Sequence, residues 1–214
     1  MQELLYTIAI WAVPVLFAIT LHEAAHGWVA SKLGDPTARQ LGRITMNPIK
    51  HIDPIGTVVV PLVLVTLSGF IIGWAKPVPV DPRHFKQPLL DMALVALAGP
   101  VSNFIMACCW ALLITLSTGL LADTSMAIHL AQMGKAGMII NIILMVLNML
   151  PIPPLDGGRV LAGVLPTNVA LSYMRIEPYG MWIILALLMT GYLGKILWPI
   201  VVRFEAIISA IFIF

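Results

Sequence analysis

The clearest chemical signal is His22-Glu23-Ala24-Ala25-His26, in which two histidines lie four residues apart and a glutamate follows the first. On an α-helix this spacing places both imidazoles on one face, one turn apart, where they can bind a single metal ion. Glu23 could then polarise a water molecule on that ion. Such a short pattern also arises by chance, but ionisable groups directly after an apolar run are costly in a membrane unless they are paired or ligated. The segment therefore predicts a metal site.

A catalytic zinc ion usually has three protein ligands and one open position, so a further donor must come from elsewhere. His51 and His84 lie in polar connections, and His129 stands between two apolar runs, where a solvated histidine is the ordinary explanation. Asp156 differs, because it ends an uncharged run and precedes two glycines that would allow close approach to another helix. We predict Asp156 as the third ligand. The residues alone leave one alternative open, an aspartate that caps a helix beginning near Gly157.

The elements that position these residues must lie in a lipid bilayer. The chain has 214 residues, of which 60% are hydrophobic and 10% charged, and its mean hydropathy is +0.97. One water-soluble core could not bury that much apolar surface. The net charge of +2 is small and the basic residues are scattered along the segment ends, so we expect no nucleic acid as a partner. We predict an all-α polytopic membrane protein with four to six transmembrane helices, from the uncharged runs Leu4–Leu21, Pro54–Ala75, Met92–Ala122, Ala136–Leu155 and Pro178–Gly194.

The whole chain, 1–214, is predicted to form a single intramembrane domain, with a catalytic core at about 4–165 and C-terminal helices at about 178–214. Gly34-Asp35-Pro36 should end the first helix, since glycine and proline break helices. The proline-rich stretch around 74–82 is predicted to be extended or re-entrant. Residues 198–214 could form a sixth span or an interfacial segment.

Three motifs together resemble the site-2 protease family of intramembrane zinc metalloproteases, peptidase family M50, in its compact prokaryotic form. His22-Glu23-Ala24-Ala25-His26 is similar to the first family motif, and the longer segment from Asn148 to Gly158 is similar to the second. Gly99-Pro100-Val101-Ser102-Asn103 resembles a third signature between them. The match spans about 15–165, roughly two thirds of the chain.

The resemblance implies that His22, His26 and Asp156 bind zinc and that Glu23 is the general base and later the acid. It also implies that Asn148 holds the substrate or its oxyanion, for which the alternative is an interhelical hydrogen bond. Asn103 is expected to have only a structural, helix-packing role.

We therefore expect a zinc endopeptidase with one Zn²⁺ per chain that cleaves transmembrane protein substrates in or near the bilayer. The alternative is a membrane metal-ion transporter that uses the same ligands as a transit site. Transport would favour several exchangeable sites along a path, and the sequence contains one. The sequence leaves open whether the chain forms a homo-oligomer.

The ligands also constrain the topology, since His22 and Asp156 must meet at one depth. If Pro54–Ala75 and the two following runs each crossed once, Asp156 would end on the side opposite to His22, so the chain must double back between them. The positive-inside rule then predicts a multi-pass protein of the cell membrane with its active site toward the cytoplasmic leaflet. An extended edge at Val78–Val80 could also pair with an unwound substrate by strand addition.

Overall fold

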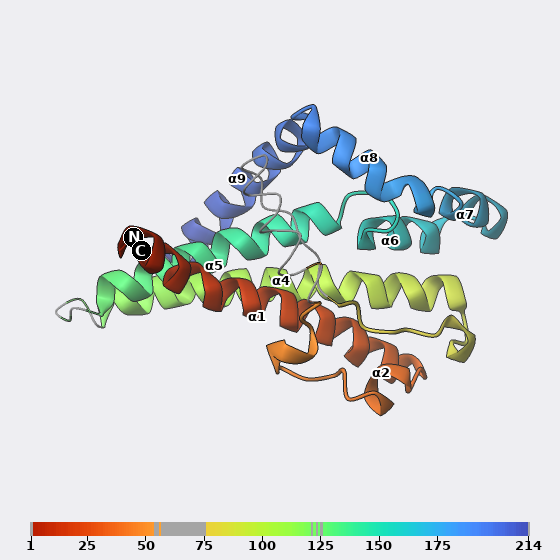
Figure 1. The fold of residues 1–214 in the computed structure, drawn as a ribbon, viewed down its shortest axis with the longest axis horizontal. Helices are drawn as coiled ribbons and strands as arrows, with labels where there is room; N and C mark the ends of the chain where they lie inside the picture. Colours follow the sequence, from red (N-terminus) through yellow and green to blue (C-terminus); the bar gives the residue numbers. More distant parts are fainter. Residues whose placement is uncertain are drawn as a thin grey trace.

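In the computed structural model, the described residues are 2–53, 56, 76–120, 122, 124 and 126–213, and their regular structure is entirely helical (Figure 1). Three long helices, α1 (Gln2–Leu33), α4 (Pro88–Gly119) and α5 (Ala127–Asn148), form the centre of the molecule. Two more, α8 (Glu177–Met189) and α9 (Tyr192–Phe212), follow near the C-terminus. The short elements are α2 (Thr37–Gln40), η1 (Pro48–Lys50), η3 (Pro82–His84), α6 (Asp156–Val164) and α7 (Thr167–Met174).

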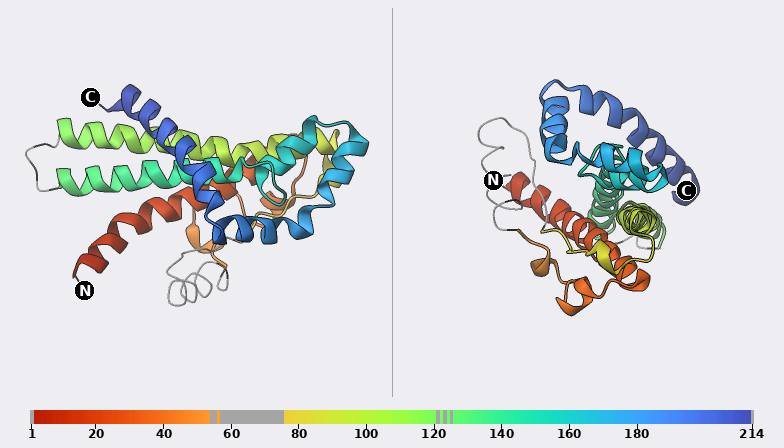
Figure 2. Two further views of the ribbon diagram at one scale, coloured as in Figure 1. Left: turned by 90° about the horizontal axis from the view of Figure 1, so that it is seen from above. Right: turned by 90° about the vertical axis from the view of Figure 1, so that its right-hand side faces the viewer.

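Helices α4 and α5 run antiparallel side by side, and α1 packs against both while its N-terminal part diverges from them (Figure 2). Small residues permit the close approach of α4 and α5, since a Cβ at Gly137 would collide with the Trp110 ring. Buried Ala107 and Ala111 of α4 and Met138 and Ile142 of α5 form a core that α9 covers. This core therefore joins α4, α5 and α9, and α1 packs beside it against α4 and α5.

In the part of the chain that the structure describes, three helices are long and apolar enough to cross a membrane, namely those containing Leu5–Leu33, Pro88–Gly119 and Ala127–Asn148. A fourth span is present if α8 and α9 together count as one. These helices confirm the predicted all-α polytopic membrane fold. The run Pro54–Ala75 lies outside the described residues.

The C-terminal helices differ from the predicted run Pro178–Gly194. Helix α8 ends at Met189, and Gly191 adopts a φ of +74°, a left-handed conformation that glycine tolerates best. The axes of α8 and α9 consequently meet at a bend of 83°. Beyond this bend, the residues from 198 onward belong to one continuous helix that ends at Phe212.

The end of α1 and the start of α4 lie at the same end of the helix bundle (Figure 2). Helix α1 ends at Leu33, as predicted, and Gly34 follows with a φ of +113°. Asp35 then accepts a hydrogen bond of 2.8 Å from the Asp81 N–H, and its Oδ1 lies 3.2 Å from His84 Nδ1. Asp35 and Asp81 thus lie at the same end of the bundle, which agrees with the depth argument. Of the predicted extended segment 74–82, residues 76–81 have no regular secondary structure.

Candidate metal centre

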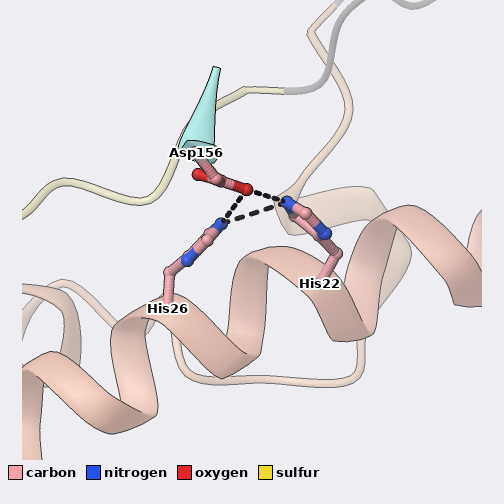
Figure 3. Close-up of side chains that lie close together, drawn as sticks. All are labelled: His22, His26 and Asp156. Atoms are coloured by element: carbon pink, nitrogen blue, oxygen red, sulfur yellow. Dashed lines mark hydrogen bonds and ion pairs between the residues drawn. The ribbon is translucent and has the colours of Figure 1, made fainter. Parts of the chain in front are cut away.

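His22 and His26 project from one face of α1, as their spacing predicts (Figure 3). Their Nε2 atoms lie 3.0 Å apart, and the two rings meet edge to face with centroids 4.6 Å apart. Both side chains are nearly buried, with 10% and 12% of their surface exposed. The two imidazoles can therefore approach one ion without repositioning of the helix.

Asp156 comes to this pair from the first residue of α6. Its Oδ2 lies 3.2 Å from His22 Nε2 and 3.5 Å from His26 Nε2 (Figure 3). The alternative role as a helix cap is not what the structure shows, because Leu155 occupies the N-cap position and no side-chain capping bond is present there. Among the described residues, only these three form a group of histidine, cysteine or acidic side chains able to hold a metal, with ligand atoms within 4.8 Å of one another.

The outer nitrogens of both rings contact hydrogen-bond acceptors. His22 Nδ1 lies 2.6 Å from the Asn103 side-chain oxygen, and His26 Nδ1 lies 2.7 Å from the Val95 carbonyl oxygen. A carbonyl oxygen only accepts a hydrogen bond, so in a neutral ring this contact favours the tautomer with its proton on Nδ1 and with Nε2 available to a metal ion. Asp156 Oδ2 is buried, and its polar contacts are those with the two histidines. Two imidazole nitrogens and one carboxylate oxygen that converge in this way form a donor set that fits zinc.

Glycines let the surrounding backbone reach the site. A Cβ at Gly99 of α4 would lie 2.5 Å from His22 Cε1 and 2.6 Å from His26 Cε1. The prediction that Gly157 and Gly158 approach another helix is wrong, because both pack against the preceding loop, at Met149 and Pro153 respectively. They let α6 begin directly on that loop and so place Asp156.

Glu23 is half-buried and contacts the extended segment that precedes α4. Its Oε2 accepts a hydrogen bond of 2.7 Å from the Val78 N–H. Pro77 and Pro79 on either side carry no N–H group. The Val78 N–H is therefore not available to pair with a substrate strand, as the strand-addition hypothesis for Val78–Val80 would need, because it already donates to Glu23.

Asn148 is the last residue of α5 and is half-buried. Its Nδ2 donates a hydrogen bond of 3.0 Å to the Leu144 carbonyl oxygen of the same helix. This bond is intrahelical, unlike the interhelical bond considered from the sequence. A role of Asn148 toward substrate stays a prediction.

The remaining histidines have other contacts. His51 Nε2 lies 3.1 Å from the Thr45 carbonyl oxygen, His84 pairs with Asp35, and His129 Nδ1 lies 2.9 Å from the Tyr6 hydroxyl. These contacts agree with the expectation that none of the three is the third ligand.

Asn103 is the residue that sequence reasoning underrated, since it contacts His22 directly and is fully buried. The spacing of the sequence could have indicated this contact, since Gly99 and Asn103 are four residues apart on α4 and so both face α1. Val95, one further turn back, belongs to the same face and supplies the carbonyl that holds His26. The three residues together form the wall of α4 behind the histidine pair.

Comparisons with known proteins found one family model and several curated relatives. The model of "Peptidase family M50" matches residues 120–191, which include Asp156. "Putative zinc metalloprotease YwhC" of Bacillus subtilis is 40% identical over 189 residues, which cover 87% of this chain and 83% of that protein. "Putative zinc metalloprotease Rip2" of Mycolicibacterium smegmatis is 29% identical over 180 residues, or 84% of this chain and 66% of its own length. No solved structure matches the chain.

Proposed function

Because this chain belongs to peptidase family M50 and is a zinc metalloprotease of the membrane, we propose that it hydrolyses peptide bonds in or near transmembrane segments of other membrane proteins. The observation that carries the proposal is the convergence of three metal-binding atoms among helices long enough to span a bilayer. Buried ionisable groups at such a place are costly, and a catalytic role explains their presence.

One zinc ion per chain would be held by His22 Nε2, His26 Nε2 and Asp156 Oδ2. When bound, zinc supplies Lewis-acid chemistry, since it polarises a peptide carbonyl and lowers the pKa of water to about 7. Asn103 and the Val95 carbonyl hold the outer nitrogens of the histidines and keep both rings aimed inward.

Glu23 is the proposed general base, which takes a proton from the attacking water and later returns it to the leaving amine. The Val78 N–H holds one carboxylate oxygen and so limits the rotation of this side chain. Asn148 has two amide N–H groups and uses one on its own helix. The other could donate to the developing negative charge on the scissile carbonyl.

The catalytic unit would comprise about 4–165, with the C-terminal helices at about 178–214 packed onto it. We place the protein in the cell membrane with the site toward the cytoplasm. Basic residues support this orientation, since they gather on segments at the end of the bundle where α1 ends and α4 begins, including Lys32, Arg39, Arg83, Lys86, Arg159 and Arg175.

The proposal is tested by reconstituting the wild type and Glu23→Gln into lipid vesicles with a panel of single-span substrates and quantifying bound zinc in both. We expect cleavage by the wild type alone and the same zinc content in both proteins, because Glu23 is a base and not a ligand. Cleavage that persists in Glu23→Gln would refute the role of Glu23. Zinc flux across the vesicle membrane without cleavage by either protein would support the transporter alternative.

A further inference from the structure

We propose that Asn103 and Asn141 act together as positioning residues that fix the tautomer of His22, so that Nε2 is free for a metal ion. The inference rests on the proposed function of the site, because it assigns a role toward the same metal. Neither asparagine is a ligand. Asn103 would act by contacting His22, and Asn141 would act by orienting Asn103.

The orientation of the Asn103 amide follows from its neighbours. Its Nδ2 lies 3.3 Å from the Ala18 carbonyl oxygen of α1, and 2.9 Å from Asn141 Oδ1 of α5. Since a backbone carbonyl can only accept a hydrogen bond, the amide nitrogen must face Ala18. Asn103 Oδ1 therefore faces His22 Nδ1, at 2.6 Å.

Asn141 is oriented by the same logic. Its Nδ2 donates a bond of 2.8 Å to the Gly137 carbonyl oxygen, one turn earlier in α5. The Oδ1 of Asn141 is thus left to accept from Asn103. The hydrogen bonds that run from Asn141 through Asn103 to His22 form a relay. The backbone carbonyls of Gly137 and Ala18 set the direction of every bond in this relay.

This direction matters because a neutral histidine has two tautomers. If Nε2 of His22 carried the proton, that nitrogen could not bind a metal ion. An acceptor at Nδ1 excludes this tautomer, since Nδ1 must then donate. Both asparagines are fully buried, so their amides interact with these protein partners and not with bulk water.

His26 provides an internal control for the relay. Its Nδ1 faces the backbone carbonyl of Val95, which no side-chain substitution removes. The acceptor at His22 Nδ1, in contrast, is the side chain of Asn103, which a substitution can remove. A general loosening of the bundle should affect both histidines, whereas loss of the relay should affect His22 only.

The test measures histidine tautomers and zinc affinity separately. Metal-free protein with ¹⁵N-labelled histidine is studied in detergent micelles by long-range ¹H–¹⁵N correlation NMR, with the ring signals assigned by single histidine substitutions. We expect Nδ1–H at His22 and His26 in the wild type. In Asn103→Leu, His22 should populate the Nε2–H tautomer and His26 should not change. Zinc affinity, from competition with a chromophoric chelator, should fall about 10- to 100-fold.

Two further variants keep the proposal testable if the leucine variant folds poorly. A protonated aspartate in Asn103→Asp presents one C=O and one O–H in place of the amide, so it should retain Nδ1–H at His22 and most of the zinc affinity. Asn141→Leu leaves Asn103 bonded to Ala18 and should lose less affinity than Asn103→Leu. Ser117→Ala is the matched control, since Ser117 is buried in the same helix and bonds only the Ile114 carbonyl.

Unchanged His22 tautomers in Asn103→Leu would overturn the proposal, even if zinc affinity fell, because the asparagines would then serve packing alone. Equal zinc affinity of the wild type and Asn103→Leu would also overturn it. A wild type that binds no zinc would refute the proposed metal site instead, and the tautomer comparison in metal-free protein would still decide the role of the asparagines.

Discussion

Gly99 and His22 are in direct contact across the interface of α4 and α1. A Cβ at residue 99 would lie 2.5 Å from His22 Cε1 and 2.6 Å from its Nε2. Non-bonded carbon atoms do not approach so closely, and the neighbour here is a stiff aromatic ring. The α4 backbone at Gly99 is thus the surface on which both imidazoles rest.

Gly99→Ala should displace the histidines and weaken zinc binding by at least about 10-fold, the scale of losses seen when the support of a ligand is removed. Chelator competition on purified protein measures the change. Gly119→Ala is the matched control, because it lies in the same helix and its Cβ would meet no atom within 4 Å. Unchanged zinc affinity in Gly99→Ala would contradict the contact.

Val78→Pro should reduce proteolysis about 10-fold or more while zinc content stays the same, since one lost hydrogen bond to a charged group costs about 1.5–3 kcal/mol. The substitution removes the N–H that holds the Glu23 carboxylate and leaves the three proposed zinc ligands untouched. Steady-state cleavage and zinc quantification are measured side by side. Val78→Ala retains the N–H and should stay within about 3-fold of the wild type. Equal losses in both variants would show that the Val78 side chain, not its N–H, is what matters.

The sequence was sufficient to predict the parts of the site that depend on local spacing. His22 and His26 fall on one helical face because four residues make about one turn. The place of Asp156 after an apolar run made it a candidate ligand, a helix cap stayed open as the alternative, and the family resemblance favoured the ligand. Its approach to the histidines agrees with that choice. The predicted end of the first helix at Gly34 also depends on local conformation alone.

Contacts between helices could not be predicted in the same way. The register of α4 against α1 decides whether Asn103 contacts His22 or only packs between the helices. No local sequence pattern specifies that register. The Val78 bond to Glu23 joins residues 55 positions apart in a segment without regular structure. The bend at Gly191 was missed because a glycine within an apolar run is compatible with either a helix or a break.

Asp35 connects the end of α1 to the segment that reaches Glu23, and its charge should make this connection pH-dependent. Burial raises the pKa of this carboxyl, but hydrogen bonds from Thr37 and the Asp81 N–H, together with nearby His84, outweigh that effect and hold the pKa below its ordinary value of 3.8. The ionised form therefore stabilises the folded state above about pH 4, and this contribution is lost as pH falls through the folded-state pKa.

Asp35→Asn should lower the free energy of unfolding by about 1–3 kcal/mol at pH 7, and the difference from wild type should shrink as pH falls below about 4. The difference in stability is measured by tryptophan fluorescence during thermal unfolding in detergent, at a series of pH values on both sides of pH 4. Glu3→Gln, which changes an exposed acid in the first turn of α1, is the control and should have little effect. A difference that stays constant with pH would show that the Asp35 charge is not involved.

Orientation in the membrane is the last prediction. The positive-inside rule places the basic end of the bundle, where α1 ends, in the cytoplasm and the connection between α4 and α5 outside. In a Cys108→Ala/Cys109→Ala background, exposed Ala122 and Arg39 report the two ends when changed singly to cysteine. An impermeant maleimide added to intact cells should label Ala122→Cys at once and Arg39→Cys only after lysis. The reverse pattern would place the metal-binding residues toward the outer leaflet, and substrates would then have to present their scissile bonds from that side.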